Sequence, residues 1–178
     1  MQEQVNGSDA AAAGVVMRPG MVDAFPAPAM IIDVQCIGAD GVEKWREVSH
    51  NVVCTAGKTD LVDKYLKGSA YTATWYCILA GAGTKAAGDT LASHAGWTES
   101  TPYSGNRPTI TWGSTSSGSN TSSAVSISIN ATATVAGAGC CTVNTGTSGV
   151  LYNVSDFGAS RSVVSGDTLN VTFTLSVT

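Results

Sequence analysis

The sequence predicts a mainly β fold: an antiparallel, jelly-roll-like β-sandwich with one short α-helix and an extended N-terminal arm. Apolar residues alternate with Ser, Thr or Asn over 124–130 and 168–177, as in strands with one buried and one solvated face. Turn-forming residues separate about eight or nine such runs, which is typical of sandwiches and jelly rolls. The chain of 178 residues is long enough for one domain with its own core. We therefore expect an arm over 1–28 and one β-sandwich domain over 29–178.

The first 28 residues show no sustained hydrophobic period. Pro19, Pro26 and Pro28 lie in this stretch, and residues that precede proline favour extended backbone. Because such a segment has no core of its own, we expect contacts with other chains to order it. The interface residues that we predict are its large apolar side chains: Val15, Val16, Met17, Met21, Val22 and Phe25.

A hairpin and a helix are expected next. Runs over 30–37 and 42–48 flank a Gly-Ala-Asp-Gly turn, and the charges of the second run predict an edge strand or a well-solvated strand. The helix is predicted over 59–67, with Thr59 as its N-cap and Gly68 just after its end. Its apolar stripe is Leu61, Val62, Tyr65 and Leu66.

The remaining strands are predicted over 71–79, 97–100, 107–113, 124–130, 132–143, 150–152 and 168–177, with a Gly- and Ala-rich loop over 80–96. In the first of them, Tyr71, Ala73, Trp75, Cys77 and Leu79 share one face. We expect the core to contain Trp75, Leu79, Leu61, Leu66, Ile127, Ile129, Val171, Phe173 and Leu175.

Composition argues against several classes of partner. The formal net charge is −4 and the pI is about 4.9, which disfavours nucleic-acid binding through a basic surface. Uninterrupted apolar runs are too short for a transmembrane helix, so no membrane partner is expected.

The residues after Met1 are polar and do not resemble a secretion signal. We therefore expect assembly in a reducing cytoplasm. The five cysteines, without a C-x-x-C pair, are interpreted as small buried hydrophobes.

Catalytic motifs are weak, and we expect neither an enzyme nor a cofactor or metal site. His50 and His94 have no metal-ligand spacing around them. The run Gly-Ala-Gly-Thr-Lys over 81–85 departs from the phosphate-binding loop pattern. Ser93, His94 and Asp89 have the residue types of a hydrolase triad without its order. Asp89 and Glu99 form a loop carboxylate pair, so polysaccharide cleavage is a remote alternative.

Four segments resemble stretches of small structural proteins of tailed bacteriophages. They are 51–76 (NVVCTAGKTDLVDKYLKGSAYTATWY), 87–99 (AGDTLASHAGWTE), 149–152 (GVLY) and 161–171 (RSVVSGDTLNV). The resemblance covers about 41–178, and the family is variously labelled head decoration, cement or tail-fibre-like.

This resemblance implies a capsid cement or decoration protein that binds the outside of the major capsid protein shell. It further implies a homo-oligomer, a dimer or trimer, located on the outer capsid surface of the virion. The alternative is a tail or head fibre protein that binds host-surface glycans. The family supplies no catalytic residues to transfer.

Overall fold

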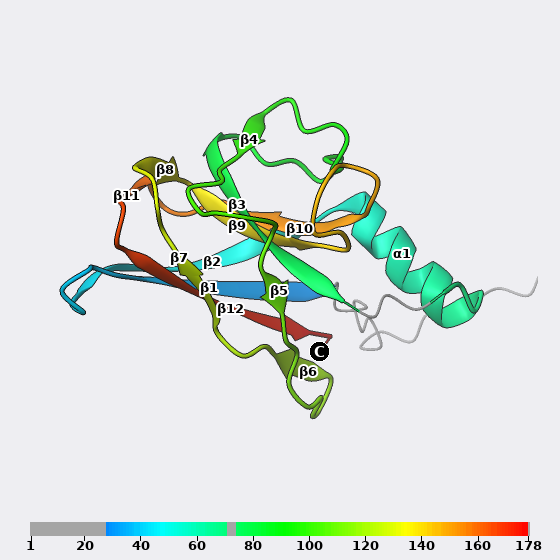
Figure 1. Cartoon of the computed structure of the whole chain (residues 1–178). Helices are drawn as coiled ribbons and strands as arrows, with labels where there is room; N and C mark the ends of the chain where they lie inside the picture. Colours follow the sequence, from blue (N-terminus) through cyan, green and yellow to red (C-terminus); the bar gives the residue numbers. More distant parts are fainter. Residues whose placement is uncertain (1–27, 71–73, 178) are drawn as a thin grey trace, which may run out of the picture.

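The computed structural model describes residues 28–70 and 74–177. Within them the chain forms antiparallel strands and one α-helix (Figure 1), which confirms the predicted mainly β fold. The elements in chain order are β1 (Ala29–Ile37), β2 (Glu43–Val53), α1 (Thr55–Leu66), β3 (Trp75–Gly83), β4 (Trp97–Glu99), β5 (Thr109–Ile110), β6 (Ser119–Thr121), β7 (Val125–Ser128), β8 (Ala133–Val135), β9 (Gly137–Cys141), β10 (Leu151–Ser155), β11 (Arg161–Val163) and β12 (Thr168–Ser176).

Strand β2 belongs to both layers of the sandwich. It pairs with β1 as far as Ile31↔His50, and from Asn51 onward it pairs with β10. The strand order is β4-β3-β9-β10-β2-β1-β12-β6, with β5 beside β3 and β7 beside β12. Because β2 turns from one layer into the other, β1 and β12 lie opposite β3, β9 and β10 (Figure 1).

The main core fills the space between these two layers. Ile32, Val34 and Phe173 reach it from β1 and β12, and Leu79 and Cys140 reach it from β3 and β9; all five are fully buried. The alternating burial along β1 and β12 follows the period of two that the sequence shows. The facing surfaces of the two layers therefore pack mainly through apolar side chains.

A second buried cluster covers the outer face of the β3–β9–β10 layer. Ile78, Cys141 and Leu151 point into it, and they are covered by Leu91 from the loop before β4 and by Trp97 at the start of β4. Cys140 and Cys141 are neighbours on β9 and lie in different clusters, as the alternation of a strand requires. All five cysteines are free and buried.

Small residues let the strands of this layer approach closely. A Cβ placed on Gly139 would lie 2.2 Å from the carbonyl oxygen of Asn153, far inside van der Waals contact. The prediction of a loop from residue 80 was wrong here, because β3 continues to Gly83 and Ala80 pairs with Gly137. Glycine and alanine serve close strand packing in this region, rather than turn formation.

The helix begins four residues before the predicted start. The prediction of Thr59 as the N-cap was wrong: Cys54 occupies that position, and the Thr59 hydroxyl donates to the carbonyl of Thr55 within the helix. The first turn instead gains backbone partners from outside, since the Cys54 N–H donates to Tyr152 at 3.0 Å and the Thr55 N–H to Ala87 at 2.7 Å. Tertiary contacts therefore replace the side-chain cap at this end.

Five of the nine predicted core residues are buried: Leu79, Ile127, Ile129, Val171 and Phe173. Trp75 and Leu175 are half-buried and pack against the core. The predictions for Leu61 and Leu66 were wrong, because these side chains are 39% and 73% exposed. The helix instead packs its first turn against the sheet through Gly57, where an added Cβ would lie 2.4 Å from the carbonyl oxygen of Tyr152.

Some predicted strands have different bounds. The run over 132–143 is two strands, β8 paired with β11 and β9 paired with β3 and β10. The run over 107–113 contains only the short β5, followed by a bridge between Trp112 and Ser122. Tyr71 and Ala73, and all of the arm before Pro28, lie outside the described residues.

Replacement of Phe173 by alanine is expected to destabilise the domain by about 3–5 kcal/mol, because the ring is fully buried between the layers. Leu66→Ala is the matched control, and its effect is expected to stay within about 0.5 kcal/mol because that side chain is exposed. Urea unfolding of the two variants measures both values. A large loss in Leu66→Ala with a small loss in Phe173→Ala would contradict this description of the core.

Candidate functional site

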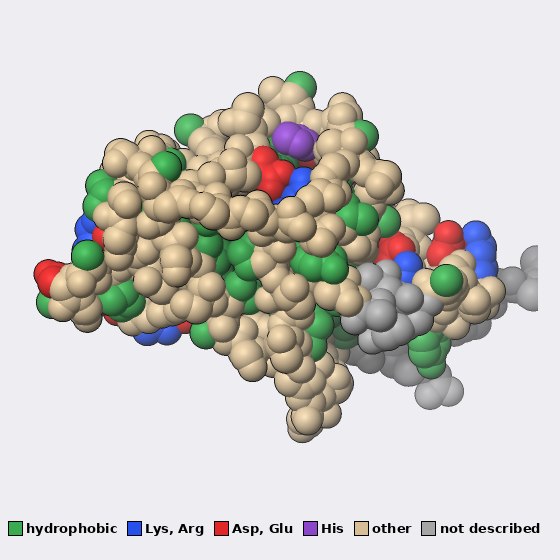
Figure 2. Space-filling view, viewed as in Figure 1, with side chains coloured by type: hydrophobic (Ala, Val, Ile, Leu, Met, Phe, Trp, Pro, Cys, Tyr) green, Lys and Arg blue, Asp and Glu red, His purple; other side chains and the backbone are tan. Residues whose placement is uncertain are grey.

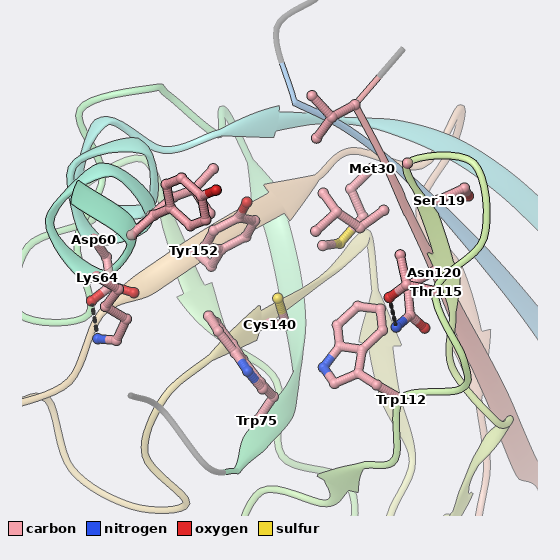
Figure 3. Close-up of a pocket in the computed structure, with 15 residues that line it drawn as sticks. Met30, Asp60, Lys64, Trp75, Trp112, Thr115, Ser119, Asn120, Cys140 and Tyr152 are labelled. Carbon is pink, nitrogen blue, oxygen red and sulfur yellow. Dashed lines mark hydrogen bonds and ion pairs between the residues drawn. The ribbon is translucent and has the colours of Figure 1, made fainter. Parts of the chain in front are cut away.

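A pocket of about 590 Å³ opens at the end of the sandwich where β2 leaves β1. Both layers and the helix contribute to it: Met30 from β1, Trp75 from β3, Tyr152 from β10, and Leu61 from α1. Figure 3 shows the rings of Trp75, Trp112 and Tyr152 arranged around Cys140. The pocket is therefore a gap in the packing between the layers, at the side covered by α1.

The pocket walls are mainly aromatic and apolar. Trp75 contacts Tyr152 edge to face, with ring centroids 5.3 Å apart and planes at 84°. Trp112 packs against the core residue Phe173, with centroids 6.4 Å apart. Leu175 completes the wall on the β12 side. The positions of Trp75 and Trp112 are thus fixed by packing against the core.

Two buried polar atoms in this wall have no hydrogen-bond partner among the described residues: the Tyr152 hydroxyl and the Asn120 Oδ1. Burial raises the pKa of Tyr152 to about 12, so its hydroxyl is neutral and can donate a hydrogen bond. The Asn120 amide group donates to Gly113 O at 3.0 Å and to Thr115 Oγ1 at 2.9 Å. The Asn120 oxygen is therefore left as an acceptor.

A bulge in β10 explains the position of Tyr152. The pairing with β9 shifts between Leu151↔Cys141 and Asn153↔Cys140, so Tyr152 is the extra residue. Tyr152 joins the main core cluster, whereas Leu151 lies in the second cluster. The bulge thus directs an aromatic ring toward the open end of the sandwich.

Helix α1 forms one rim of the pocket and leaves apolar side chains uncovered. Leu61 and Tyr65 line the pocket, and Val62 and Leu66 are 51% and 73% exposed. We call Leu61, Val62, Tyr65 and Leu66 the exposed helix face. Figure 2 shows further hydrophobic side chains at the surface between the two layers of strands. Contiguous apolar surface of this kind marks sites of interaction with other molecules.

The sequence-predicted interface residues, Val15 to Phe25 in the arm, lie outside the described residues. The pocket itself was not predicted, because the strand pattern places Trp75 in the core and no sequence motif singles out Trp112 or Tyr152. The stripe Leu61–Leu66 was recognised, but as core. The charged residues Asp60, Asp63 and Lys64 stand between the apolar residues of this stripe, and this pattern could have indicated that the helix is partly solvated.

The loop motifs considered for catalysis hold the fold around Trp97. The Asp89 carboxylate accepts from the Trp97 indole N–H at 2.8 Å and from the Ala86 N–H at 2.9 Å. His94 stacks on Trp97 with centroids 4.1 Å apart, and its Nδ1 lies 3.0 Å from the Trp97 carbonyl. Asp89 and His94 thus both contact Trp97, and neither is engaged with Ser93 in a relay.

Lys85 and Glu99 also have structural partners. The Lys85 ammonium donates to the carbonyls of Gly81 and Gly83, each at 2.9 Å, and lies 2.6 Å from the Asp156 carboxylate. It therefore points into the protein rather than toward a bound phosphate. Glu99 forms a two-point ion pair with Arg107, at 2.8 and 2.7 Å.

No protein-family model matches this chain, and no curated protein matches it either. Among the described residues, no group of three or more His, Cys, Asp and Glu side chains is placed to hold a metal ion. Over the same part of the chain, no helix is both long enough and apolar enough to cross a membrane.

Asp167 is a buried carboxylate away from the pocket that ties the β1–β2 hairpin to the turn before β12. It lies 2.7 Å from the Lys44 ammonium and accepts from the Val164 N–H at 2.9 Å. Burial would raise the pKa of Asp167, but the hydrogen bonds from Lys44 and Val164 outweigh it and hold this pKa below its ordinary value. The ionised form therefore stabilises the fold.

We expect Asp167→Asn to destabilise the protein most at neutral pH. A lowered folded-state pKa contributes stability that is complete above the unfolded value of about 3.9 and is lost as the pH falls through the folded value. The difference in unfolding free energy between the natural protein and Asp167→Asn should thus shrink between about pH 4 and pH 2. Chemical denaturation over pH 2–7 measures this difference, and a constant difference across the range would contradict the assignment.

Proposed function

We propose that this protein is a non-enzymatic virion protein of a tailed bacteriophage. In this proposal it is a cement or decoration protein that binds the outer surface of the major capsid protein shell and stabilises it. It is a homo-oligomer and is assembled onto particles in the host cytoplasm. The phage assignment derives from the sequence resemblance over about 41–178, and the binding role derives from the surface of the domain.

The exposed helix face is the observation that carries the binding role. Four large apolar side chains lie on one helix beside an apolar pocket, and their exposures range from 39% for Leu61 to 87% for Tyr65. A side chain of this size gains about 1.5–3 kcal/mol when a partner covers it completely. Because a shell presents many equivalent sites, modest contacts per copy are sufficient for stable coverage.

The rest of the surface suits an outer position on a particle. Only 12% of the residues are charged, and hydroxyl side chains occupy solvated strand positions, as Ser126 and Ser128 on β7 illustrate. Hydroxyl groups keep such strands solvated without many charges. The net charge of −4 disfavours an inner position next to the phosphates of a packaged genome.

A second candidate function is a tail or head fibre protein that binds host-surface glycans. Trp75 and Trp112 favour it, because aromatic rings at the rim of a pocket offer flat apolar surfaces for sugar rings. The pocket wall has few free polar groups, notably the Tyr152 hydroxyl and the Asn120 oxygen. A sugar presents many hydroxyl groups, so this scarcity favours an apolar occupant instead.

Stoichiometry separates these two functions. For a cement protein, quantitative mass spectrometry of purified virions is expected to give a copy number close to that of the major shell protein. For a fibre, only a few copies per particle are expected, confined to the tail or to one vertex. A small copy number would therefore contradict the cement proposal.

Paired variants test the surface involved. Val62→Ser combined with Leu66→Ser is expected to reduce shell occupancy without loss of folding, because both side chains are exposed and lie outside the pocket wall. Val42→Ser is the matched control, since Val42 is 61% exposed in the β1–β2 turn, at the opposite end of the domain from α1 (Figure 1). Equal occupancy for both proteins would exclude the exposed helix face as the contact.

A further inference from the structure

We infer that the pocket at the open end of the sandwich binds the N-terminal arm of a second copy of this chain, with Phe25 as the inserted side chain. The inference goes beyond the proposed function, because it concerns how two copies associate in the absence of any capsid. It depends on three properties: the chemistry of the pocket wall, the composition of the arm, and the place where the arm joins the domain.

The pocket wall has the chemistry of a peptide-binding site. Trp75, Trp112 and Leu175 offer an apolar surface for a large side chain. The Tyr152 hydroxyl can donate to a carbonyl group, and the Asn120 oxygen can accept from an N–H group. A peptide backbone carries both of these groups, so an extended segment would satisfy the two buried polar atoms while its side chain fills the apolar space.

The arm has the matching composition. Between residues 15 and 25 it carries six large apolar side chains and only two charged ones, Arg18 and Asp23. Phe25 is the one aromatic residue before β1. Aromatic side chains are the commonest anchors in well-packed interface pockets. A neutral segment with one aromatic anchor therefore fits an aromatic, apolar pocket better than a charged partner would.

The junction of arm and domain favours a second copy over the same copy. Met30 lines the pocket and belongs to β1, so the arm leaves the domain at the pocket rim. Phe25 and Ala27 each precede a proline, and residues before a proline favour extended backbone. Five extended residues, the distance from Phe25 to Met30, would span about 16–18 Å. An arm of this reach would carry Phe25 beyond the rim of its own pocket, where it can enter the pocket of a neighbouring copy.

Reciprocal exchange follows when two copies are related by a two-fold axis. Each arm would then lie in the partner's pocket, and the same surface would be used on both chains. The exchange covers the pocket and the adjoining residues of α1, and it leaves Val62 and Leu66 free for another contact. Self-association and shell binding would therefore use different surfaces of the same helix.

Sedimentation equilibrium of the full-length chain tests the self-association. Phe25→Ser is expected to weaken it by roughly a hundredfold to ten-thousandfold, because a reciprocal dimer loses two buried aromatic side chains, one from each arm. Asp23→Ser is the matched control in the same arm and is expected to leave the association unchanged. Tyr152→Phe, which removes one hydrogen bond in each of the two pockets, is expected to weaken it roughly fivefold to a hundredfold. It should not lower the unfolding midpoint, because the removed hydroxyl has no partner among the described residues.

Disulfide capture identifies the chain that supplies the arm. A full-length chain with Phe25→Cys is mixed with a full-length chain with Val177→Cys, which places a thiol on the exposed pocket rim. A covalent product of twice the chain mass is expected when the mixture is mildly oxidised, and not when either variant is oxidised alone. The background from native thiols is low, because all five are buried and burial raises the pKa of Cys36 and Cys54 to about 11.

Each other outcome overturns the inference. A full-length chain that is monomeric at every concentration excludes the exchange. A disulfide that forms only within the double variant Phe25→Cys and Val177→Cys would place the arm in its own pocket. Equal self-association of Phe25→Ser and Asp23→Ser would remove Phe25 as the anchor. None of these results bears on the copy number in virions, so the shell-binding role in the proposed function is judged separately.

Discussion

The change of partner within β2 determines the arrangement of the rest of the domain. Up to His50 the strand extends the layer of β1, and from Asn51 it extends the layer of β10. One strand thereby joins the two layers and sets them face to face. The same change separates β1 from β10 at the end of the sandwich where β2 leaves β1. Met30 of β1 and Tyr152 of β10 both line the pocket at this end. The opening is thus a consequence of the topology rather than a local defect in packing.

Close packing in the β3–β9–β10 layer supports this arrangement. Gly137 and Gly139 on β9 face backbone atoms of β10, and an added Cβ at either would lie 2.1–2.2 Å from a carbonyl oxygen. Gly57 similarly brings α1 against Tyr152. Because the helix is held by its first turn, its later turns extend beyond the sheet and leave their apolar side chains uncovered. The packing that stabilises the domain therefore also leaves the exposed helix face uncovered.

Much of the fold could be predicted from the sequence, because the period of two in β1, β7 and β12 directly reports which side chains face the core. Phe173, Val171 and Ile127 were placed correctly on this basis. The helix start could not be predicted, since Cys54 and Thr55 are capped by backbone atoms of Tyr152 and Ala87, which are distant in sequence. The burial of Leu61 and Leu66 was predicted wrongly for a related reason. An apolar stripe indicates that a surface can be covered, but it does not indicate whether the same chain or another one covers it.

The candidate site could be predicted only in part. Its aromatic residues come from separate regions, and Trp75, Trp112 and Tyr152 meet only because β3, the segment after β5 and β10 converge at the open end. The β10 bulge that turns Tyr152 toward this end depends on pairing with β9, which no local pattern encodes. The arm was predicted to be an interface because it has no core of its own, and we place one of its predicted residues, Phe25, in the pocket.

The central claim is that this domain is an assembly protein that contacts a shell through its exposed helix face. A reconstruction of the purified virion tests it most directly, since the domain can be placed in the density by its sandwich and its single described helix. The account predicts regularly repeated copies on the outer surface, with Val62 and Leu66 against the major capsid protein. Density for the domain only in the tail, or copies on the shell with α1 facing solvent, would contradict it.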